Sequence, residues 1–459
     1  MKKAAFTALF IVAVYIYAQE APSPQSSVTD SQETARFNTV KYGTETEIAA
    51  LIQSLKSEGV DYLDDEIILL ADKTNNQKIL SGAFAFFGER EKTGLEDRAI
   101  RAIDERDFEE NETVLAAIDY LGRVKLSSAM PSLRELLESG EKRFMNAAFR
   151  ALGRISGRDE QPGDMANDTA DYLVDYYENR DVGDENRRDV ITAMGLTGSS
   201  KAVKFLSGIA TDNEERMPLR IAALDALNKI GDPAGLDAVL ACVSAKDPNI
   251  RSAAVGALGP FSGNAVDEAI LDAFRDSYYK TRIAAAQASS RRKLAAAVPY
   301  LKFRAERDDV PSVKDDSIRA LGAIADSEAM GILEELFTVR KNPDRVRIIA
   351  GEMLMQNEPD KYLESFVKEL DEAKQKSQNA LYNGLLKILG GVTCANMETI
   401  TRRLMQTSGI VEKSFALDMA ANNNLKSLQE EIKAVAADKN ESLARKARRT
   451  MEKLGIKEE

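Results

Sequence analysis

Apolar residues fall along this chain with the spacing of α-helices. In the stretch NIRSAAVGALG, residues 249 to 259, Ile250, Ala253, Ala254, Ala257 and Leu258 stand at positions i, i+3, i+4, i+7 and i+8. This spacing places them on one face of a helix. No part of the chain alternates apolar and polar residues with period two, so the pattern predicts helices and no sheet.

The same helix recurs at a nearly constant step. With Leu258 as the anchor, the equivalent positions are Phe87, Leu121, Leu152, Met194, Leu227, Ser289, Leu321, Leu354, Leu389, Met419 and Met451. Neighbouring anchors lie 30 to 35 residues apart, except for one step of 42 residues between Leu152 and Met194. A period of this length is typical of solenoids, in which each unit is one supersecondary element.

A glycine follows many of these anchors. It stands at Gly88, Gly122, Gly153, Gly195, Gly259, Gly322 and Gly390. Glycine lets a neighbouring helix approach closely or forms a turn near a helix end. We expect one of these two roles rather than ligand binding. The unit around Ser289 has neither leucine nor glycine at the anchor, so we expect irregular packing there.

Each anchor helix is followed by a second amphipathic segment. In GLDAVLACVSAKD the apolar residues Leu236, Val239, Leu240 and Val243 again have helical spacing. Turn signals such as GDPAG and KDPN separate the segments, with proline where a helix starts. One pair of helices cannot bury its apolar seam, whereas stacked pairs can. We therefore predict an all-α fold, an α-solenoid (superhelix) of about twelve two-helix repeats.

The unit DPNIRSAAVGALG…AVDEAILDAFRD resembles a HEAT repeat, and specifically the short HEAT-like repeats first named for phycobilisome (PBS) lyases. The matching elements are Asp247, Pro248 and Arg251, the small pair Ala253 and Ala254, and ALG at 257–259. Weaker copies carry a basic residue at Arg187, Arg220, Arg282, Lys314 and Arg347. The resemblance covers residues 60 to 455. It implies scaffolds and binding surfaces, and the lyase activity of a subset is not carried over because no bilin-binding cysteine or histidine arrangement is present.

Asp247 and Arg251 allow two interpretations. A row of arginines along stacked helices would form an anion-binding stripe. Alternatively, Arg251 and its copies Arg220, Arg282 and Arg347 form, with Asp247, a structural ladder of hydrogen bonds and ion pairs between repeats. We favour the ladder, because these arginines adjoin the buried face of the helix, where charges need partners.

The beginning of the chain indicates export. MKK followed by AAFTALFIVAVYIYA has the charged start and apolar middle of a signal peptide, residues 1–18, with Ile16 and Ala18 at positions −3 and −1. Residues 19–44 are polar and without periodicity, which predicts a flexible linker. The solenoid then covers residues 45–459, with an insertion at 157–171 where the long step falls. The alternatives are an uncleaved anchor and a cytoplasmic scaffold.

Composition removes many kinds of active site. The chain has no histidine, which excludes histidine general bases, Ser-His-Asp triads and histidine-containing metal sites. We predict no cofactor, no metal and no enzyme activity. The alternative is an enzyme of the cell envelope, or an accessory subunit of one, that uses paired carboxylates. A deep pocket with two convergent acids of shifted pKa would favour it.

Several side chains are candidates for binding. Tyrosine is a common interface anchor, and we single out Tyr172, Tyr176, Tyr177, Tyr278 and Tyr279, although core packing explains them equally well. The aspartates of the 157–171 insertion do not match the spacing of an EF-hand. Cys242 is expected in the core and Cys394 in a turn, too far apart along the stack for a disulfide.

The charge balance bears on the partner. The formal net charge is −12, so polyanions are repelled overall and we predict no nucleic-acid binding. The local exception is RKARRTMEK, residues 445–453, which we interpret as the charged outer face of a terminal helix. The sequence thus predicts an exported, periplasmic or secreted, scaffold. Its concave surface binds other proteins through a basic or mixed-charge patch on the partner.

Overall fold

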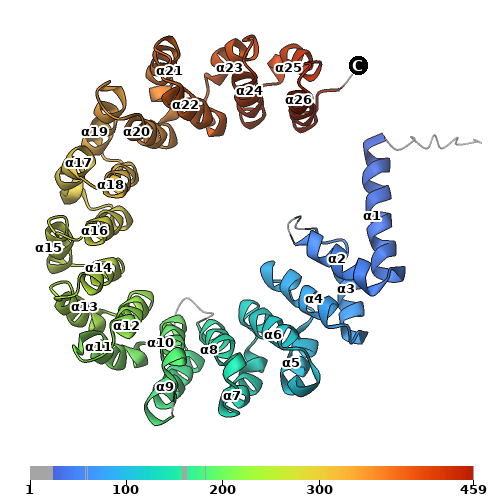
Figure 1. Cartoon of the computed structure of the whole chain (residues 1–459), viewed down its shortest axis with the longest axis vertical. Coiled ribbons are helices and arrows are strands. Elements are labelled where there is room, and N and C mark those ends of the chain that lie inside the picture. The colour runs from blue at the N-terminus through green and yellow to red at the C-terminus, as the bar shows by residue number, and fades with distance from the viewer. Residues whose placement is uncertain (1–23, 57, 59, 158–162, 181, 458–459) are drawn as a thin grey trace, which may run out of the picture. The chain divides into compact units, whose positions relative to one another are not determined.

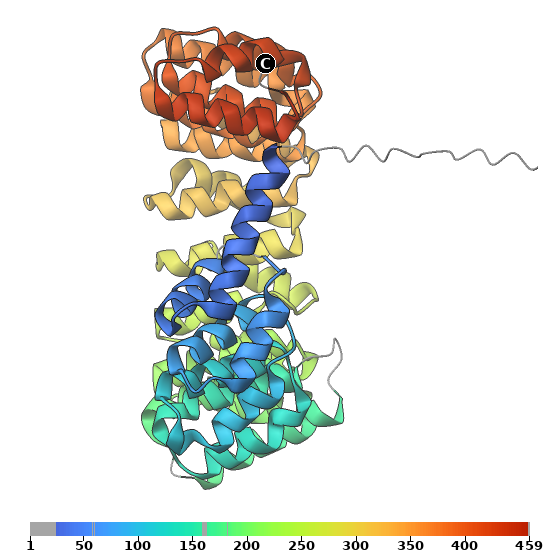
Figure 2. The same cartoon turned by 90° about the vertical axis from the view of Figure 1, so that its right-hand side faces the viewer.

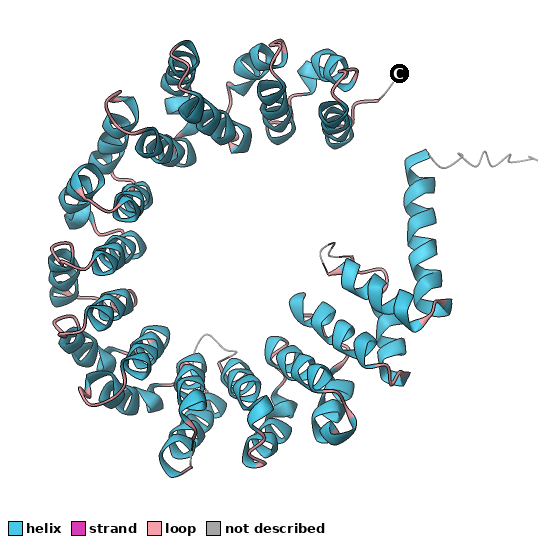
Figure 3. Cartoon of the chain, viewed as in Figure 1, coloured by secondary structure: helices cyan, strands magenta, loops and turns pink. Residues whose placement is uncertain are grey.

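The computed structural model describes residues 24–56, 58, 60–157, 163–180 and 182–457. In these ranges it contains helices and loops but no strand (Figure 3). The all-α solenoid predicted from the sequence is confirmed. Residues 1–18, the predicted signal peptide, lie outside the described residues. Within the described ranges no helix is both long enough and apolar enough to cross a membrane.

The chain divides into two compact units, residues 1–158 and 159–459, whereas the sequence pattern predicted one continuous array from residue 45. The division falls inside the predicted 157–171 insertion. Residues 158–162 of that insertion lie outside the described residues. The residues from Asp164 to Asp171 are not a surface loop but the first half of a helix, α9.

The first unit contains eight helices within its described residues. They are α1 (Pro24–Tyr42), α2 (Glu45–Leu55), α3 (Asp64–Lys73), α4 (Gln77–Glu89), α5 (Glu96–Asp104), α6 (Asn111–Arg123), α7 (Met130–Glu138) and α8 (Lys142–Ser156). The even-numbered helices pack on one another in a row, α2 on α4, α4 on α6 and α6 on α8. Each odd-numbered helix from α3 onwards packs against the even-numbered helix that follows it.

The second unit continues the same alternation. Its odd-numbered helices are α9 (Asp164–Asn179), α11 (Val203–Thr211), α13 (Leu236–Cys242), α15 (Asn264–Ala273), α17 (Val298–Arg307), α19 (Ser327–Thr338), α21 (Pro359–Gln375), α23 (Met397–Met405) and α25 (Gln429–Ala436). Its even-numbered helices are α10 (Asp184–Thr197), α12 (Met217–Ile230), α14 (Pro248–Ala257), α16 (Tyr279–Arg292), α18 (Pro311–Ile324), α20 (Asp344–Asn357), α22 (Asn379–Gly391), α24 (Ile410–Asn422) and α26 (Glu441–Leu454). Within this unit the rows curve, and the even-numbered helices line the inner, concave side (Figure 1).

The predicted anchors form the buried column of these rows. Eleven of the twelve lie on the even-numbered helices α4 to α26, the twelfth, Leu258, is the C-cap of α14, and none is more than 2% exposed. Ile52 of α2 lies 35 residues before Phe87 and is also fully buried, so a further helix joins the row in the first unit. Ser289 is fully buried in α16, which packs on α14 and α18. Ser289 therefore keeps its place in the row, but its hydroxyl oxygen is buried without a hydrogen-bond partner within the described part of the chain.

Six of the seven glycines after the anchors lie inside helices, whereas Gly259 lies in the turn that follows α14. Gly122 of α6 faces α8, where an added Cβ would lie 3.0 Å from the Cα of Ala151. The same construction at Gly195 of α10 places a Cβ 2.7 Å from the Cα of Ala226 in α12. Of the two roles expected for these glycines, close approach of successive helices is the one that the structure shows at both positions.

Helix α1 differs from the flexible linker predicted for residues 19–44. It runs unbroken from Pro24 to Tyr42 (Figure 2). Its C-terminal half is held by contacts with other elements of the first unit. Val40 is 4% exposed, and Arg36 donates two hydrogen bonds to Glu58, of 2.7 and 2.9 Å. Single contacts of this kind leave no periodicity in a polar sequence, and the pattern therefore missed this helix.

Candidate protein-binding surface

Six even-numbered helices of the second unit, α10 to α20, each hold a basic side chain against a backbone carbonyl at the end of the preceding odd-numbered helix or just after it. The side chain donates to a backbone carbonyl in each case: Arg187 to Val182, Arg220 to Ala210, Arg251 to Ala245, Arg282 to Asp276, Lys314 to Glu306 and Arg347 to Phe337. The last carbonyls of a helix lack partners within the helix, and a cation is favourable there. We call these six residues the ladder cations.

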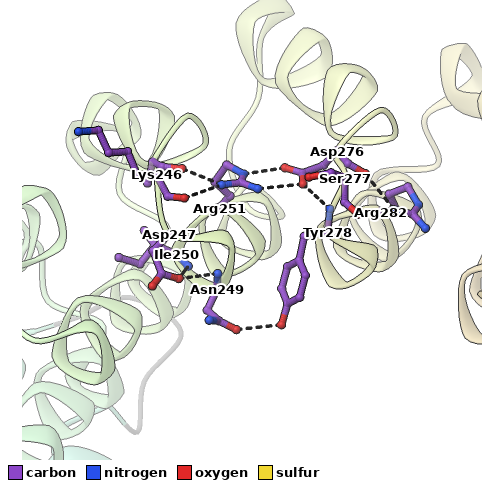
Figure 4. A network of polar contacts seen from close by, with 10 residues as sticks. Lys246, Asp247, Asn249, Ile250, Arg251, Asp276, Ser277, Tyr278 and Arg282 are labelled. Carbon is purple, nitrogen blue, oxygen red and sulfur yellow. Dashed lines mark hydrogen bonds and ion pairs between the residues drawn. The ribbon is translucent and has the colours of Figure 1, made fainter.

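Three ladder cations also form an ion pair with a carboxylate from the following repeat. Arg251 binds Asp276 through Nε and Nη2, at 2.7 and 3.0 Å (Figure 4). Arg282 binds Asp308 in the same bidentate way, at 2.7 and 2.8 Å. Arg347 donates to Glu369, and both side chains are buried. This geometry is the inter-repeat ladder that we favoured over an anion-binding stripe.

Burial and hydrogen bonding act in opposite directions on Asp308. Burial by itself raises the pKa of its carboxyl group. Hydrogen bonds from the Arg282 guanidinium and the Val310 amide outweigh burial and hold the pKa below its usual value. A lowered pKa means that the carboxylate contributes stability above the ordinary pKa of aspartate, about 3.9. That contribution is lost as the pH falls through the lowered value.

Asp247 has a different role from the one that the sequence predicted. Its Oδ1 accepts hydrogen bonds from the amides of Asn249 (2.7 Å) and Ile250 (3.4 Å), and it is the N-cap of α14 (Figure 4). The sequence analysis missed Asp276 and Asp308, the carboxylates that pair with Arg251 and Arg282. A signal for them exists, because each stands six residues before the next ladder cation.

The candidate tyrosines lie mostly within the packing of the helices. Tyr176 is 5% exposed, and the ring of Tyr177 meets that of Phe205 at 5.2 Å between centroids. The hydroxyl of Tyr278 donates to Asn249 at 2.9 Å (Figure 4). Tyr172, with its ring centroid 5.9 Å from that of Tyr176, is half-buried. The fifth candidate, Tyr279, is 37% exposed at the start of α16 and alone of the five is available as an anchor.

The concave side of the second unit carries a mixed set of side chains. The positions two and six residues before each anchor are exposed or half-exposed on most even-numbered helices. They include Arg188, Thr192, Ile221, Asp225, Ser252, Ile283, Gln287, Arg319, Ile348, Glu352, Asn383, Lys387, Arg445 and Arg449. Apolar, acidic, basic and neutral polar residues alternate in these columns, although isoleucine recurs at 221, 283 and 348, whereas the buried anchor column is almost entirely apolar. The side chains on this surface are therefore not determined by packing between repeats, and they are available for specific contacts with a partner.

A groove of about 810 Å³ lies between α24 and α26 on this side. One wall is formed by Ile410, Ser414, Asp418 and Ala421, and the other chiefly by Arg445, Lys446, Arg449, Thr450 and Lys453. The basic stretch 445–453 thus lines an inner groove rather than an outer face, because α26 belongs to the even-numbered row.

The charges in the groove are unequally compensated. Lys446 donates to Asp418 at 2.6 Å and to Ser414 at 2.9 Å. Arg449 and Lys453 are exposed and have no partner among the described residues. Ile410, at the mouth of the groove, is 51% exposed. The groove therefore offers two free cations on α26, and an exposed apolar side chain at the start of α24.

The described residues that line the groove between α24 and α26 do not include the paired carboxylates of the enzyme alternative. Asp418 is the one acid in the groove, and Lys446 holds it. Asp225 lies on the exposed side of α12, yet partial burial raises the pKa of its carboxyl group, and the charges that act on it are the cations Lys229 and Arg188. Over the described ranges no cluster of three acidic or thiol side chains is arranged to hold a metal ion.

Cys242 and Cys394 are free thiols. Cys242 is 2% exposed in α13, and Cys394 is half-buried in the loop between α22 and α23. Burial raises the pKa of both thiols. Both are therefore mainly protonated near neutral pH and poorly nucleophilic.

The comparisons with known proteins point to one family. The family model described as "Spirochaete HEAT repeat protein" matches residues 40–450. No curated protein matches the chain.

Among solved structures the chain is similar to karyopherins. These include Kap121p bound to the extreme C-terminus of the protein phosphatase Cdc14p, with 11% identity over 93% of this chain and 54% of that one, and a TM-score of 0.43. Kap121p bound to Pho4p gives 11% identity, 93% and 54% coverage, and a TM-score of 0.41. Kap95p with RanGDP gives 11% identity over 93% of this chain and 68% of that one, with a TM-score of 0.40. The chain spans about half the length of Kap121p, and no functional conclusion follows from these likenesses.

Proposed function

The chain belongs to the family of spirochaete HEAT repeat proteins, and on that premise we propose that it is an exported, non-catalytic scaffold that binds another protein on the concave side of its second unit. The groove between α24 and α26 is the observation that supports this proposal most strongly. Stacked repeats present long, curved surfaces suited to many moderate contacts, with a few anchors that determine affinity.

The chemistry of the groove indicates what part of the partner binds there. Arg449 and Lys453 are unpaired cations that attract carboxylates, and Ile410, at the start of α24, gives an apolar contact in the same groove. We therefore expect an extended acidic segment with an apolar side chain. This differs from the basic or mixed-charge patch expected from the net charge of −12. Net charge averages over the whole surface. A ligand in the groove, by contrast, is affected mainly by charges within a Debye length of about 8 Å.

Replacing both free cations of the groove is expected to weaken partner binding. In the Arg449→Ser/Lys453→Ser variant, we expect recovery of the partner after in vivo crosslinking of the envelope fraction, followed by quantitative mass spectrometry, to fall about tenfold, equivalent to about 1.4 kcal/mol. Binding of the wild type should also weaken with added salt, because the contact is electrostatic.

The matched control is Lys439→Ser/Lys457→Ser, which removes the same charge from two exposed residues outside the groove. This variant should recover the partner like the wild type. Equal losses for the two variants would show that net charge, and not the groove, determines binding. If crosslinking recovers no protein reproducibly from the wild type, the scaffold proposal fails.

Export makes a separate prediction. Cleavage after Ala18 leaves Gln19 as the first residue of the mature protein. Mass spectrometry of the protein isolated from the envelope or the medium should find this N-terminus. A protein that retains Met1 and fractionates with the cytoplasm would instead support the cytoplasmic scaffold.

A further inference from the structure

Arg220 is the ladder cation that lacks a carboxylate although it is almost fully buried. It is 7% exposed, and its Nε donates to the carbonyl of Ala210 at 3.0 Å. No carboxylate among the described residues lies within ion-pair distance of it. The equally buried Arg282 and Arg347 each bind an acid from the following repeat. A buried guanidinium without a counter-charge is costly.

Arg220 lacks a carboxylate because Ala245 occupies the position at which a following repeat has an aspartate. Arg251 donates to the carbonyl of Ala245 at 3.0 Å, as Arg282 donates to the carbonyl of Asp276 at 2.9 Å (Figure 4). Ala245 therefore stands in its repeat where Asp276 stands in the next one. The side chain of Asp276 binds Arg251. The residue in the corresponding position for Arg220 is Ala245, whose side chain is a methyl group.

In one other repeat a carboxylate binds its ladder cation from a different position in the chain. At the corresponding position after Arg220 there is a thiol. Glu369 lies 22 residues after its arginine, Arg347, and Cys242 lies 22 residues after Arg220. The Cys242 thiol donates to the carbonyl of Ala210 at 3.3 Å, the same carbonyl that accepts from Arg220. Burial raises the pKa of this thiol, while the nearby Arg220 opposes that effect. A neutral thiol does not compensate the charge of the guanidinium.

A cavity of about 560 Å³ opens at this gap, and Arg220, Cys242, Ala245, Lys246 and Asp247 are among its lining residues. Lys246 adds a second cation, and it is exposed. Asp247 is the acid of the cavity, and its Oδ1 already accepts the two amide hydrogen bonds at the start of α14. The cavity thus has cations and room on the side where the carboxylate is missing.

Lys314 offers an instructive contrast. It also lacks a ladder carboxylate, because the corresponding position is Lys341, and a cavity of about 500 Å³ opens beside it. Lys314 is half-buried, however, and Glu306 and Glu335 line that cavity. Arg220 is the more deeply buried of these two cations, so the cost of its unpaired charge is the larger.

We infer that the cavity at Arg220 binds the carboxylate of a ligand, which takes the position of the missing ladder aspartate. The carboxylate comes from an acidic side chain of a peptide segment or from a free small acid, and the experiment separates these sources. The site does not rest on the proposed scaffold function, because none of its residues lines the groove between α24 and α26.

The test uses the full chain and two acidic probes, glutarate and a blocked hexapeptide with one central aspartate. Their neutral counterparts are glutaramide and the same peptide with asparagine. We expect ligand-observed NMR at low ionic strength to detect binding of the acids and not of the amides. Tighter binding of the peptide identifies a protein source, and tighter binding of glutarate identifies a small acid. Absence of binding by both acids overturns the inference.

Ala245→Asp supplies the missing carboxylate within the chain. We expect it to reduce the affinity for the acidic probe at least tenfold and to raise Tm, so that loss of binding is not loss of folding. Ala234→Asp adds the same charge at an exposed residue outside the cavity and should bind like the wild type. Arg220→Gln should also lose binding, whereas Arg449→Ser/Lys453→Ser should retain it. An Ala245→Asp protein that binds the acidic probe as tightly as the wild type would refute the site.

Discussion

Replacing Arg282 by alanine is expected to lower the free energy of unfolding of the second unit by about 3–5 kcal/mol. The reason is the partner that remains. The side chain of Asp308 is fully buried, and it accepts two hydrogen bonds from Arg282. Without the Arg282 guanidinium, the buried carboxylate keeps only the longer contact with Arg304, at 3.3 Å, and the amide of Val310, so that much of its charge loses its partner. Urea and thermal unfolding followed by far-UV circular dichroism measure the loss.

The control for this variant is Arg275→Ala. Arg275 binds Asp272 at 2.8 Å, but both side chains are largely exposed, at 65% and 76%. An exposed pair contributes about 0–1 kcal/mol, so stability should change little. If the two variants lose equal stability, the buried ladder does not stabilise the stack as we describe. Arg251→Ala, whose pair is less buried than that of Arg282, should lower Tm by an intermediate amount.

Replacing Gly195 by alanine is expected to destabilise the second unit by about 1–3 kcal/mol, the typical cost of overpacking. The added Cβ would lie 2.7 Å from the Cα and 2.8 Å from the Cβ of Ala226. A backbone atom cannot move aside by a change of rotamer, so α10 and α12 must separate. This cost exceeds the gain of about 1 kcal/mol that alanine brings to a helix interior. Thermal unfolding measures the balance.

Gly331→Ala is the matched variant. Gly331 lies inside α19, is exposed, and has no atom within 4 Å of the position of an added Cβ. Here the helix propensity acts alone, and we expect stability to rise by about 0.5–1 kcal/mol. Were both variants more stable than the wild type, the glycines after the anchors would not be needed for close approach of the helices.

The buried columns could be predicted from the sequence because each repeat contacts mainly its neighbours in the chain. Leu227 and Leu258 lie one period apart, as do Leu321 and Leu354, and burial of one implies burial of the other. Gly195 could be placed in the same column but not assigned a role. Whether it forms a turn or a close contact depends on Ala226 in the next helix.

The basic residues of the groove could be identified from the sequence, but their position on the inner side of the repeats could not. The stretch 445–453 is visibly basic in the sequence, and its charges suggested an outer face. The row to which α26 belongs turns those charges towards α24, where Asp418 and Ser414 hold Lys446. Which cations remain unpaired is decided by the neighbouring helix, since an ion pair requires two side chains to meet within a few ångström.

By itself the sequence determined the helical fold, the step of the repeats, the anchors and the presence of a basic row, because these features follow from periodicity within one helix and its immediate neighbours. The tertiary structure alone decided that Arg251 pairs with Asp276 and not with Asp247, that α1 is a helix, and that Arg220 faces a cavity without a carboxylate. Side chains meet across the seam between repeats, and their distance there depends on how the helices pack. Residue spacing does not encode that distance.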